Sequence, residues 1–304
     1  MTLYDLPAPA KLNLFLHVVG RRADGYHLLE SLFRLISLSD SITLDLRTDG
    51  RISRSSDMAG LVDESDDLVV KAARLLQERT GTVMGAHLSV TKRIPLGGGL
   101  GGGSSNAATV LIGLNRLWRT GLSRRQLAEL GLALGADVPF FIFGQSAFVQ
   151  GVGEDLVAVP APEASYLVVK PAVAVPTAMV FADPNLTRDS DRVKISDFSG
   201  ISRFIGSESY LGFGRNDLER VACRLFPVVH ASMQSVRREG YSVRLSGSGS
   251  CFFAELENPH AAELARLRLA AKIGNSEIGS DTEIETVFAC DGLPQHPLRY
   301  WLED

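Results

Sequence analysis

The stretch Pro95-Leu96-Gly97-Gly98-Gly99-Leu100-Gly101-Gly102-Gly103-Ser104-Ser105 places six glycines among the seven residues 97–103, directly before a segment with helical spacing. Ordering so many glycines has a high entropic cost, so folding alone does not account for them. Without side chains, successive backbone N–H groups can converge on phosphate oxygens above a helix N-terminus. The serines add hydroxyl groups. Because apolar segments flank it, the loop is not typical of a flexible linker, and it predicts phosphate binding.

Two common nucleotide-binding motifs fit this loop poorly. Gly97, Gly99 and Gly102 satisfy the G-x-G-x-x-G pattern of dinucleotide-binding proteins, which leaves a nicotinamide-dependent oxidoreductase as an alternative. That pattern also needs an acidic residue about 20 residues later to bind the ribose. Residues 119–123 instead form a basic loop, RTGLS. A Walker A loop would end in Gly-Lys-Ser/Thr, whereas this loop has no lysine, so a third class of nucleotide loop is indicated.

The sequence around the loop predicts strands and helices in two halves. In the first half we expect strands at 12–19, 41–46 and 87–91, a turn at 22–25, and helices at 67–79, 104–118 and 123–134. In the second half we expect strands at 166–170, 242–245, 251–255 and 284–289, and helices at 227–239 and 260–271. A proline-rich stretch predicts a domain boundary near residue 160, giving domains 1–160 and 161–304. Residues 187–214 are polar and predict a mobile surface segment.

Composition limits the classes of function. The chain has 304 residues, 45% hydrophobic and 22% charged, as in globular proteins of one or two domains. A net charge of -4 disfavours nucleic-acid binding. Cys223, Cys251 and Cys290 form no CxxC motif, so neither a disulfide framework nor a zinc site is expected. We see no signal peptide or membrane-spanning run, expect a cytoplasmic protein without membrane attachment, and find no sign of a protein partner.

Three segments far apart in the sequence together resemble the GHMP kinase superfamily. They are Pro9-Ala10-Lys11-Leu12-Asn13-Leu14, the loop 95–105, and Leu245-Ser246-Gly247-Ser248-Gly249-Ser250-Cys251. The resemblance implies an α+β, two-domain GHMP kinase fold, with a ribosomal protein S5 domain 2-like N-terminal domain and a ferredoxin-like C-terminal domain. It also implies ATP as phosphoryl donor to an alcohol. The motifs at 22–27 and 134–139 are most similar to members that act on a cytidine diphosphate-linked alcohol.

Asp137 and Lys11 are the expected catalytic pair. From the residues alone, Asp137 could equally be an aspartate that caps a turn, and Lys11 could be a charge on an edge strand. The resemblance implies that Asp137 accepts the proton of the attacking hydroxyl. A lysine ammonium beside it would keep the carboxylate ionised and stabilise charge on the transferred phosphoryl group.

Five residues are expected to bind the alcohol substrate. Asn13 lies two residues after Lys11, on the same strand face, and could hydrogen-bond the substrate. The resemblance implies that Tyr26 and His27 bind the cytosine, that Phe181 stacks on it opposite Tyr26, and that Thr177 lies near the reacting hydroxyl. An ordinary core position is the alternative for Phe181.

The late loop Ser246, Gly247, Ser248 and Gly249 could be a simple hairpin turn. The resemblance implies that it packs against the phosphate loop and completes the site. Mg²⁺ is expected as the partner of ATP, with Ser105 and Asp137 as its candidate ligands. A further alternative, a nucleotide sensor without catalysis, is disfavoured because Lys11 and Asp137 are both present. Asp67 stands where the family usually has asparagine.

Overall fold

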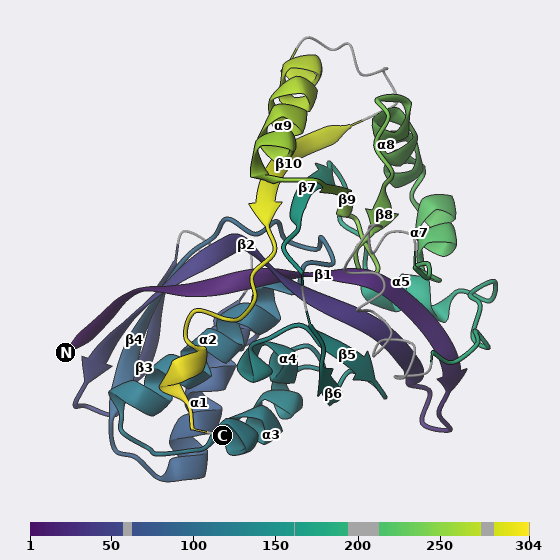
Figure 1. Ribbon diagram of the computed structural model, residues 1–304. Helices are drawn as coiled ribbons and strands as arrows, with labels where there is room; N and C mark the ends of the chain where they lie inside the picture. Colours follow the sequence, from purple (N-terminus) through teal and green to yellow (C-terminus); the bar gives the residue numbers. More distant parts are fainter. Residues whose placement is uncertain (57–62, 161, 194–212, 275–282, 304) are drawn as a thin grey trace.

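The computed structural model describes residues 1–56, 63–160, 162–193, 213–274 and 283–303, and Figure 1 shows its two β-sheets. In this part of the chain the first sheet has six strands, in the order β3-β4-β2-β5-β6 with β1 paired to β2. Its strands are β1 (Thr2–Arg21), β2 (His27–Arg47), β3 (Ile52–Ser56), β4 (Gly85–Thr91), β5 (Ala147–Gln150) and β6 (Asp155–Ala158). The strands predicted at 12–19 and 41–46 are thus parts of two long antiparallel strands.

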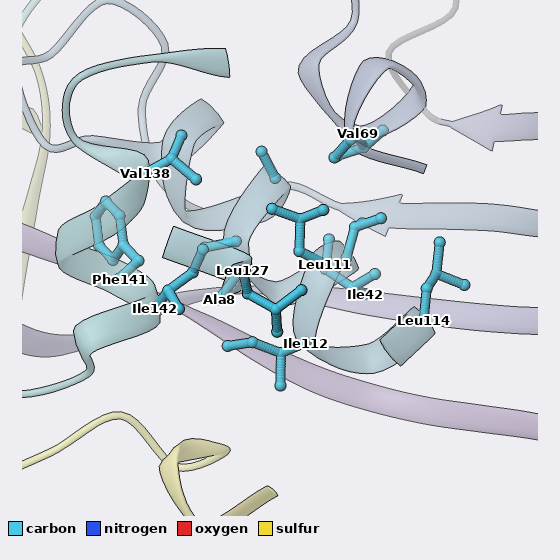
Figure 2. Close-up of a cluster of buried hydrophobic side chains, with 14 of the residues drawn as sticks. Ala8, Ile42, Val69, Leu111, Ile112, Leu114, Leu127, Val138, Phe141 and Ile142 are labelled. Atoms are coloured by element: carbon cyan, nitrogen blue, oxygen red, sulfur yellow. The ribbon is translucent and has the colours of Figure 1, made fainter. Parts of the chain in front are cut away.

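Four helices pack together beside this sheet, as Figure 1 shows. They are α1 (Leu68–Thr80), α2 (Gly102–Leu117), α3 (Arg124–Leu134) and α4 (Val138–Phe143). Helix α2 contacts β1, β2 and the other three helices, and most of its side chains are buried. The core between sheet and helices includes Ile42, Leu111 and Phe141 (Figure 2). Helix α2 is therefore buried nearly all round, which fixes the position of the glycine loop at its N-terminus.

The bounds of α1 and α3 agree with the helices predicted at 67–79 and 123–134, to within about one residue. Asp67 caps α1 by accepting a hydrogen bond from the Val69 N–H at 2.9 Å, and Gly81 ends it in the left-handed conformation, with φ of 64°. Ser123 and Gln126 form both halves of a capping box at the start of α3. Helix α4 was not predicted, because its run VPFFIF is apolar throughout and has no polar face to give it a helical period.

The second sheet has the strand order β10-β7-β9-β8 within the described ranges. Its strands are β7 (Ser165–Pro171), β8 (Arg244–Leu245), β9 (Phe252–Leu256) and β10 (Ile284–Asp291). The helices of this half are α5 (Thr177–Ala182), α7 (Glu219–Leu225), α8 (Pro227–Arg238) and α9 (Pro259–Gly274), and a short 3₁₀ turn η3 (Arg299–Trp301) follows β10. Helices α8 and α9 pack against the sheet around a second apolar core. The predicted α+β class is confirmed.

Backbone hydrogen bonds join the two halves at two places, one in β1 and one after β10. The end of β1 meets the second half, where the Leu16 N–H donates to the Arg215 carbonyl at 2.9 Å. After β10 the chain returns to the first half, and the Arg124 N–H donates to the Glu303 carbonyl at 2.9 Å. The predicted boundary at residue 160 falls between β6 and β7 and stays a prediction.

Two sequence predictions concern surface and membrane. The segment predicted to be mobile is 187–214, and residues 194–212 of it lie outside the described residues. None of the helices that the structure describes has the length and hydropathy needed to span a bilayer.

Candidate active site

The glycine loop is held by the late loop that lies beside it. The N–H groups of Ser250 and Cys251 donate to the carbonyls of Gly97 and Gly98, at 3.2 Å and 3.1 Å. The Ser246 hydroxyl donates to the Gly99 carbonyl at 3.1 Å. The predicted contact between the two loops is therefore present, and a hairpin turn without further contacts is excluded.

Close packing explains why two positions of the loop are glycine. A Cβ on Gly99, where φ is +73°, would lie 2.1 Å from the Ser246 carbonyl oxygen. A Cβ on Gly98 would lie 2.6 Å from Cys251 Sγ. Burial raises the pKa of the Cys251 thiol to about 12, so this sulfur is an uncharged packing group. The glycines thus serve the interface between the loops as well as any ligand.

A cavity of about 340 Å³ lies over this loop. Of the predicted phosphate-binding residues, it is lined by Pro95, Leu96, Gly97, Gly98, Gly99, Leu100, Gly101, Gly102, Gly103 and Ser104. It is also lined by Lys11, Asn13, Asp137, Thr177, Phe181, Gly247 and Ser248. The fold therefore collects, around one space, residues from β1, the glycine loop, the start of α4, α5 and the late loop.

Ser105 is the exception among the predicted loop residues. Its side chain is fully buried, and its hydroxyl donates to the Pro9 carbonyl at 2.7 Å rather than facing the cavity. Ser104 and Ser105 are adjacent on helix α2, where successive side chains point in different directions. The structure therefore corrects the expectation that the Ser105 side chain contacts phosphates or Mg²⁺, and leaves Ser104 at the cavity.

Lys11 and Asp137 face each other across the cavity. Lys11 Nζ lies 3.6 Å from Asp137 Oδ2, and the two side chains are 5% and 32% exposed. This burial excludes the alternative of a solvent-facing edge charge for Lys11. The Asp137 carboxylate makes no capping hydrogen bond to α4 in the described chain, which leaves it directed to the cavity. The geometry thus places a buried cation within ion-pair distance of a carboxylate that lines the cavity.

Asn13 orients this lysine. Its Oδ1 accepts a hydrogen bond from Lys11 Nζ at 2.5 Å, and its Nδ2 donates to Ser31 Oγ at 3.0 Å. The Asn13 backbone N–H donates to Ser246 Oγ at 3.3 Å. Since its amide already has these two partners, Asn13 holds Lys11 in place, and its contact with the substrate stays a prediction.

A second cavity, of about 690 Å³, adjoins the first and shares Ser104, Asp137, Thr177 and Phe181 with it. Tyr26 and His27 also line this space. The rings of His27 and Phe181 lie 5.0 Å apart between centroids, at 35°. Thr177 Oγ1 and Ser248 Oγ lie within hydrogen-bond distance, at 2.8 Å. We call this space the base end, and the space over the glycine loop the phosphate end.

The aromatic contact differs in one detail from the expectation. Phe181 packs against His27, whereas the Tyr26 ring is 64% exposed and lines the cavity beside them. The predicted sandwich between Tyr26 and Phe181 therefore stays a prediction about the bound state. Phe181 is half-buried and also contacts the second core, so it combines the packing role with a cavity-lining one.

Sequence reasoning missed two residues at the phosphate end. Lys92 lines the cavity and pairs with the buried Asp40. Asp40 also accepts hydrogen bonds from the backbone N–H groups of Arg93 and Ile94, at 2.7 Å and 2.8 Å, and so anchors the entry to the loop. The basic pair Lys92-Arg93, separated by three residues from the first glycine of the loop, was the available signal.

Comparisons with known proteins agree with this geometry. Residues 67–145 match the GHMP kinases N terminal domain, and residues 193–275 match the GHMP kinases C terminal family. The chain is 56% identical to the 4-diphosphocytidyl-2-C-methyl-D-erythritol kinase of Bordetella bronchiseptica, with 99% of each chain covered. It is 48% identical to the kinase of that name from Aromatoleum aromaticum, with 99% of this chain and 97% of the relative covered.

Solved structures give the same result. The crystal structure of a 4-(cytidine 5'-diphospho)-2C-methyl-D-erythritol kinase superposes with a TM-score of 0.75 at 34% identity, covering 96% of this chain and 99% of the other. A homoserine kinase from Cytophaga hutchinsonii shares the fold, with a TM-score of 0.71 at 18% identity over 97% of this chain and 95% of the other. The chain therefore belongs to the GHMP kinase family and is a small-molecule kinase.

Proposed function

We propose that the chain transfers the γ-phosphoryl group of ATP to the 2-hydroxyl of 4-diphosphocytidyl-2-C-methyl-D-erythritol, in the non-mevalonate route to isoprenoid precursors. One observation carries the proposal: a glycine loop, the Lys11–Asp137 pair and the His27–Phe181 rings line two adjoining cavities that share Asp137, Thr177 and Phe181. The curated relatives at 48% and 56% identity bear the name of this kinase.

The phosphate end receives the ATP phosphates. The glycine loop and the N-terminus of α2 offer backbone N–H groups and a positive partial charge, which suit phosphate oxygens. Ser104 adds a hydroxyl, and Lys92 adds a cation partly neutralised by Asp40. Because phosphoryl transfer has a loose transition state, positioning and charge stabilisation supply most of the catalysis.

Asp137 and Lys11 act at the junction of the two ends. The substrate hydroxyl oxygen forms a bond to the γ-phosphorus, the bond from that phosphorus to the bridging oxygen of ADP breaks, and the hydroxyl proton goes to the Asp137 carboxylate. Lys11, 3.6 Å from that carboxylate, pairs with it and stabilises negative charge on the transferred group. Asn13 fixes the direction of the lysine ammonium.

The base end receives the cytidine. A base that stacks on an aromatic ring gains about 1–3 kcal/mol, and Tyr26, His27 and Phe181 offer three rings around one space. Thr177 lies between the two ends, since it lines both cavities, and its hydroxyl faces Ser248. A substrate with a base at one end and a reacting hydroxyl at the other fits these two spaces, with its base in the base end and its hydroxyl at the junction beside Asp137.

Mg²⁺ is the expected companion of ATP. The ion keeps several waters and usually binds one or two carboxylates together with phosphate oxygens. Within the described ranges there is no group of three or more His, Cys, Asp or Glu that could hold a metal. A single carboxylate, Asp137, and the Ser104 hydroxyl line the phosphate end and fit an ion bound mainly through phosphates. When bound, the ion would offset charge on the phosphates.

We infer that the enzyme works in the cytoplasm. Its three cysteines are free, which fits a reducing compartment.

Release of ADP tests the proposed function. The purified chain is incubated with ATP and 4-diphosphocytidyl-2-C-methyl-D-erythritol, and ADP is followed by a coupled assay. We expect ADP release only when this alcohol is present. Homoserine, mevalonate and galactose are the matched controls, since other GHMP kinases act on such alcohols. Equal or faster turnover of any of them would overturn the substrate assignment and leave the kinase assignment intact.

A further inference from the structure

Arg188 lies behind the base end and makes four hydrogen bonds there. Its Nε donates to His27 Nε2 at 3.0 Å, and its Nη2 donates to the Phe181 and Asp183 carbonyls at 3.1 Å and 2.7 Å. Its Nη1 donates to the Leu186 carbonyl at 3.0 Å. One side chain thus contacts both residues whose rings face each other, although 161 positions separate it from His27 in the sequence.

Arg188 does not touch the space in which a ligand would bind. It is half-buried, and it belongs to the lining of neither the phosphate end nor the base end. Any effect it has on the substrate must therefore pass through His27 and Phe181. Their rings are 5.0 Å apart, so a small displacement of either one changes the shape of the base end.

Helix α5, which carries Phe181, needs such a partner. With six residues it is far too short to be stable alone, and carbonyls at its C-terminal end need donors from beyond the helix. A guanidinium group at this end supplies donors for those carbonyls, and its charge complements the helix dipole. The fork of an arginine fits this task, because several donors are held in fixed directions.

The bond to His27 also sets the state of its ring. Because the Arg188 Nε–H is a donor, His27 Nε2 must be the acceptor, so a neutral ring carries its proton on Nδ1. Burial lowers the pKa of His27, and the positive charges of Arg188 and Arg21 lower it further. Within the described residues, burial and these two positive charges therefore all favour the neutral form of the ring.

We propose that Arg188 is a positioning residue for the base end: by holding the His27 ring and the C-terminal carbonyls of α5 together, it fixes the surface that receives the pyrimidine base. The part of this inference that concerns the base rests on the proposed function.

Kinetics of Arg188→Ala and Arg188→Lys test the proposal. We expect KM for 4-diphosphocytidyl-2-C-methyl-D-erythritol to rise about 10- to 100-fold in Arg188→Ala, as for a lost hydrogen bond to a charged group. KM for ATP should stay within about threefold, because the phosphate end is built from other residues. Arg188→Lys keeps the charge but not the fork, so it should not restore the wild-type value.

Arg192→Ala is the matched control. This arginine follows on the same segment, its side chain is 65% exposed, and it meets Glu30 at 3.5 Å. We expect wild-type KM values for both substrates. Unchanged KM for the alcohol in Arg188→Ala, or equal rises in KM for the alcohol and for ATP, would overturn the positioning role, since the second result would mean a general loss of structure.

Two measurements that need no turnover separate this inference from the proposed function. By NMR of the His27 imidazole, we expect the proton on Nδ1 in the wild type, and a higher pKa in Arg188→Ala. By calorimetry, we expect cytidine 5'-diphosphate to bind the wild type at least tenfold more tightly than Arg188→Ala. Equal binding with an unchanged His27 pKa would refute the role of Arg188. Absence of alcohol phosphorylation by a wild type that binds cytidine 5'-diphosphate would refute only the proposed function.

Discussion

The phosphate end and the base end are lined by different kinds of chemical group. The phosphate end consists mostly of backbone, with glycines packed so closely on the late loop that a Cβ at Gly99 would meet the Ser246 oxygen at 2.1 Å. The base end consists of side chains, and one of them, Tyr26, is 64% exposed. Ligand binding by backbone groups depends on how the loop is folded. Ligand binding by exposed side chains can change while the fold stays the same. Substitutions at the two ends should therefore differ in their effects on stability.

Asp137→Asn, at the junction of the two ends, should have the largest effect. We expect kcat to fall about 10²- to 10⁴-fold, as is typical when a general acid or base is removed. Affinity for ATP and for the alcohol should change little, since asparagine keeps the size and shape of the side chain that both ends share. The measurements are kcat from ADP release and ligand affinity by calorimetry. Asp155→Asn, an exposed position on β6, is the control and should keep full activity. A kcat within tenfold of wild type would exclude Asp137 as the proton acceptor.

Gly99→Ala should harm both stability and nucleotide binding. The new methyl group forces the Ser246 loop to move, and overpacking of this kind has a cost of about 1–3 kcal/mol in addition to backbone strain. We expect a lower Tm and a KM for ATP raised about tenfold or more.

Gly121→Ala is its control, because φ at Gly121 is +70° against +73° at Gly99 and no atom of the described structure lies within 4 Å of its Cβ position. It should show only the strain of about 1–2 kcal/mol, with KM for ATP unchanged. Equal effects of the two substitutions on KM would mean that contact between the loops does not shape the phosphate end.

Tyr26→Ala should change binding and leave stability intact. Loss of one stacked ring is worth about 1–3 kcal/mol, so we expect KM for the alcohol to rise about 5- to 150-fold. Tm should stay near the wild-type value, because the ring is largely exposed. Tyr4→Ala, which removes a ring that is 72% exposed, is the control for KM. A fall in Tm with no change in KM would reverse the contrast between the two ends.

His296 gives the smallest effect, on stability alone, because it lies outside both ends. Burial lowers its pKa to about 4, whereas the unfolded chain has the ordinary value near 6.5. The unfolded state therefore binds this proton first as the pH falls, so the free energy of unfolding decreases from about pH 6.5 toward pH 4. At pH 5 the expected loss is about 2 kcal/mol relative to pH 7.

Urea unfolding at pH 7 and pH 5 measures this difference. In the wild type, the Leu298 N–H donates to His296 Nδ1 at 3.0 Å. The variant His296→Asn keeps an acceptor for this N–H but removes the imidazole that binds the proton. Between pH 7 and pH 5, the free energy of unfolding of this variant should therefore fall by about 2 kcal/mol less than that of the wild type. An identical pH dependence in both proteins would show that other groups cause the acid effect.

Local signals predicted much of the fold. Helices α1 and α3 were predicted nearly to their ends, because Gly81 and the capping box at Ser123 each act within one turn of backbone, whereas the capping role of Asp67 was not predicted. Helix α4 and the short strands β5 and β6 escaped prediction, since a fully buried helix has no polar face and four-residue strands show little alternation.

The site divides in the same way. The composition of the glycine loop predicts phosphate binding by itself. The roles of Lys11, Asp137 and the aromatic residues came from the resemblance to a family. Arg188 gave no signal, because its role depends on contacts with His27, which lies 161 positions earlier. Ser105 was misplaced because composition does not tell which of two adjacent serines faces the cavity.

The hydrogen bonds between the late loop and the glycine loop also determine when the glycines lose their freedom. The carbonyls of Gly97, Gly98 and Gly99 all have hydrogen-bond partners within the chain itself. The entropy of ordering the loop is therefore lost during folding, and nucleotide binding does not have to oppose it. It follows that a substitution in β8, β9 or the late loop that loosens these bonds would weaken ATP binding from a distance, by returning that entropy to the free enzyme.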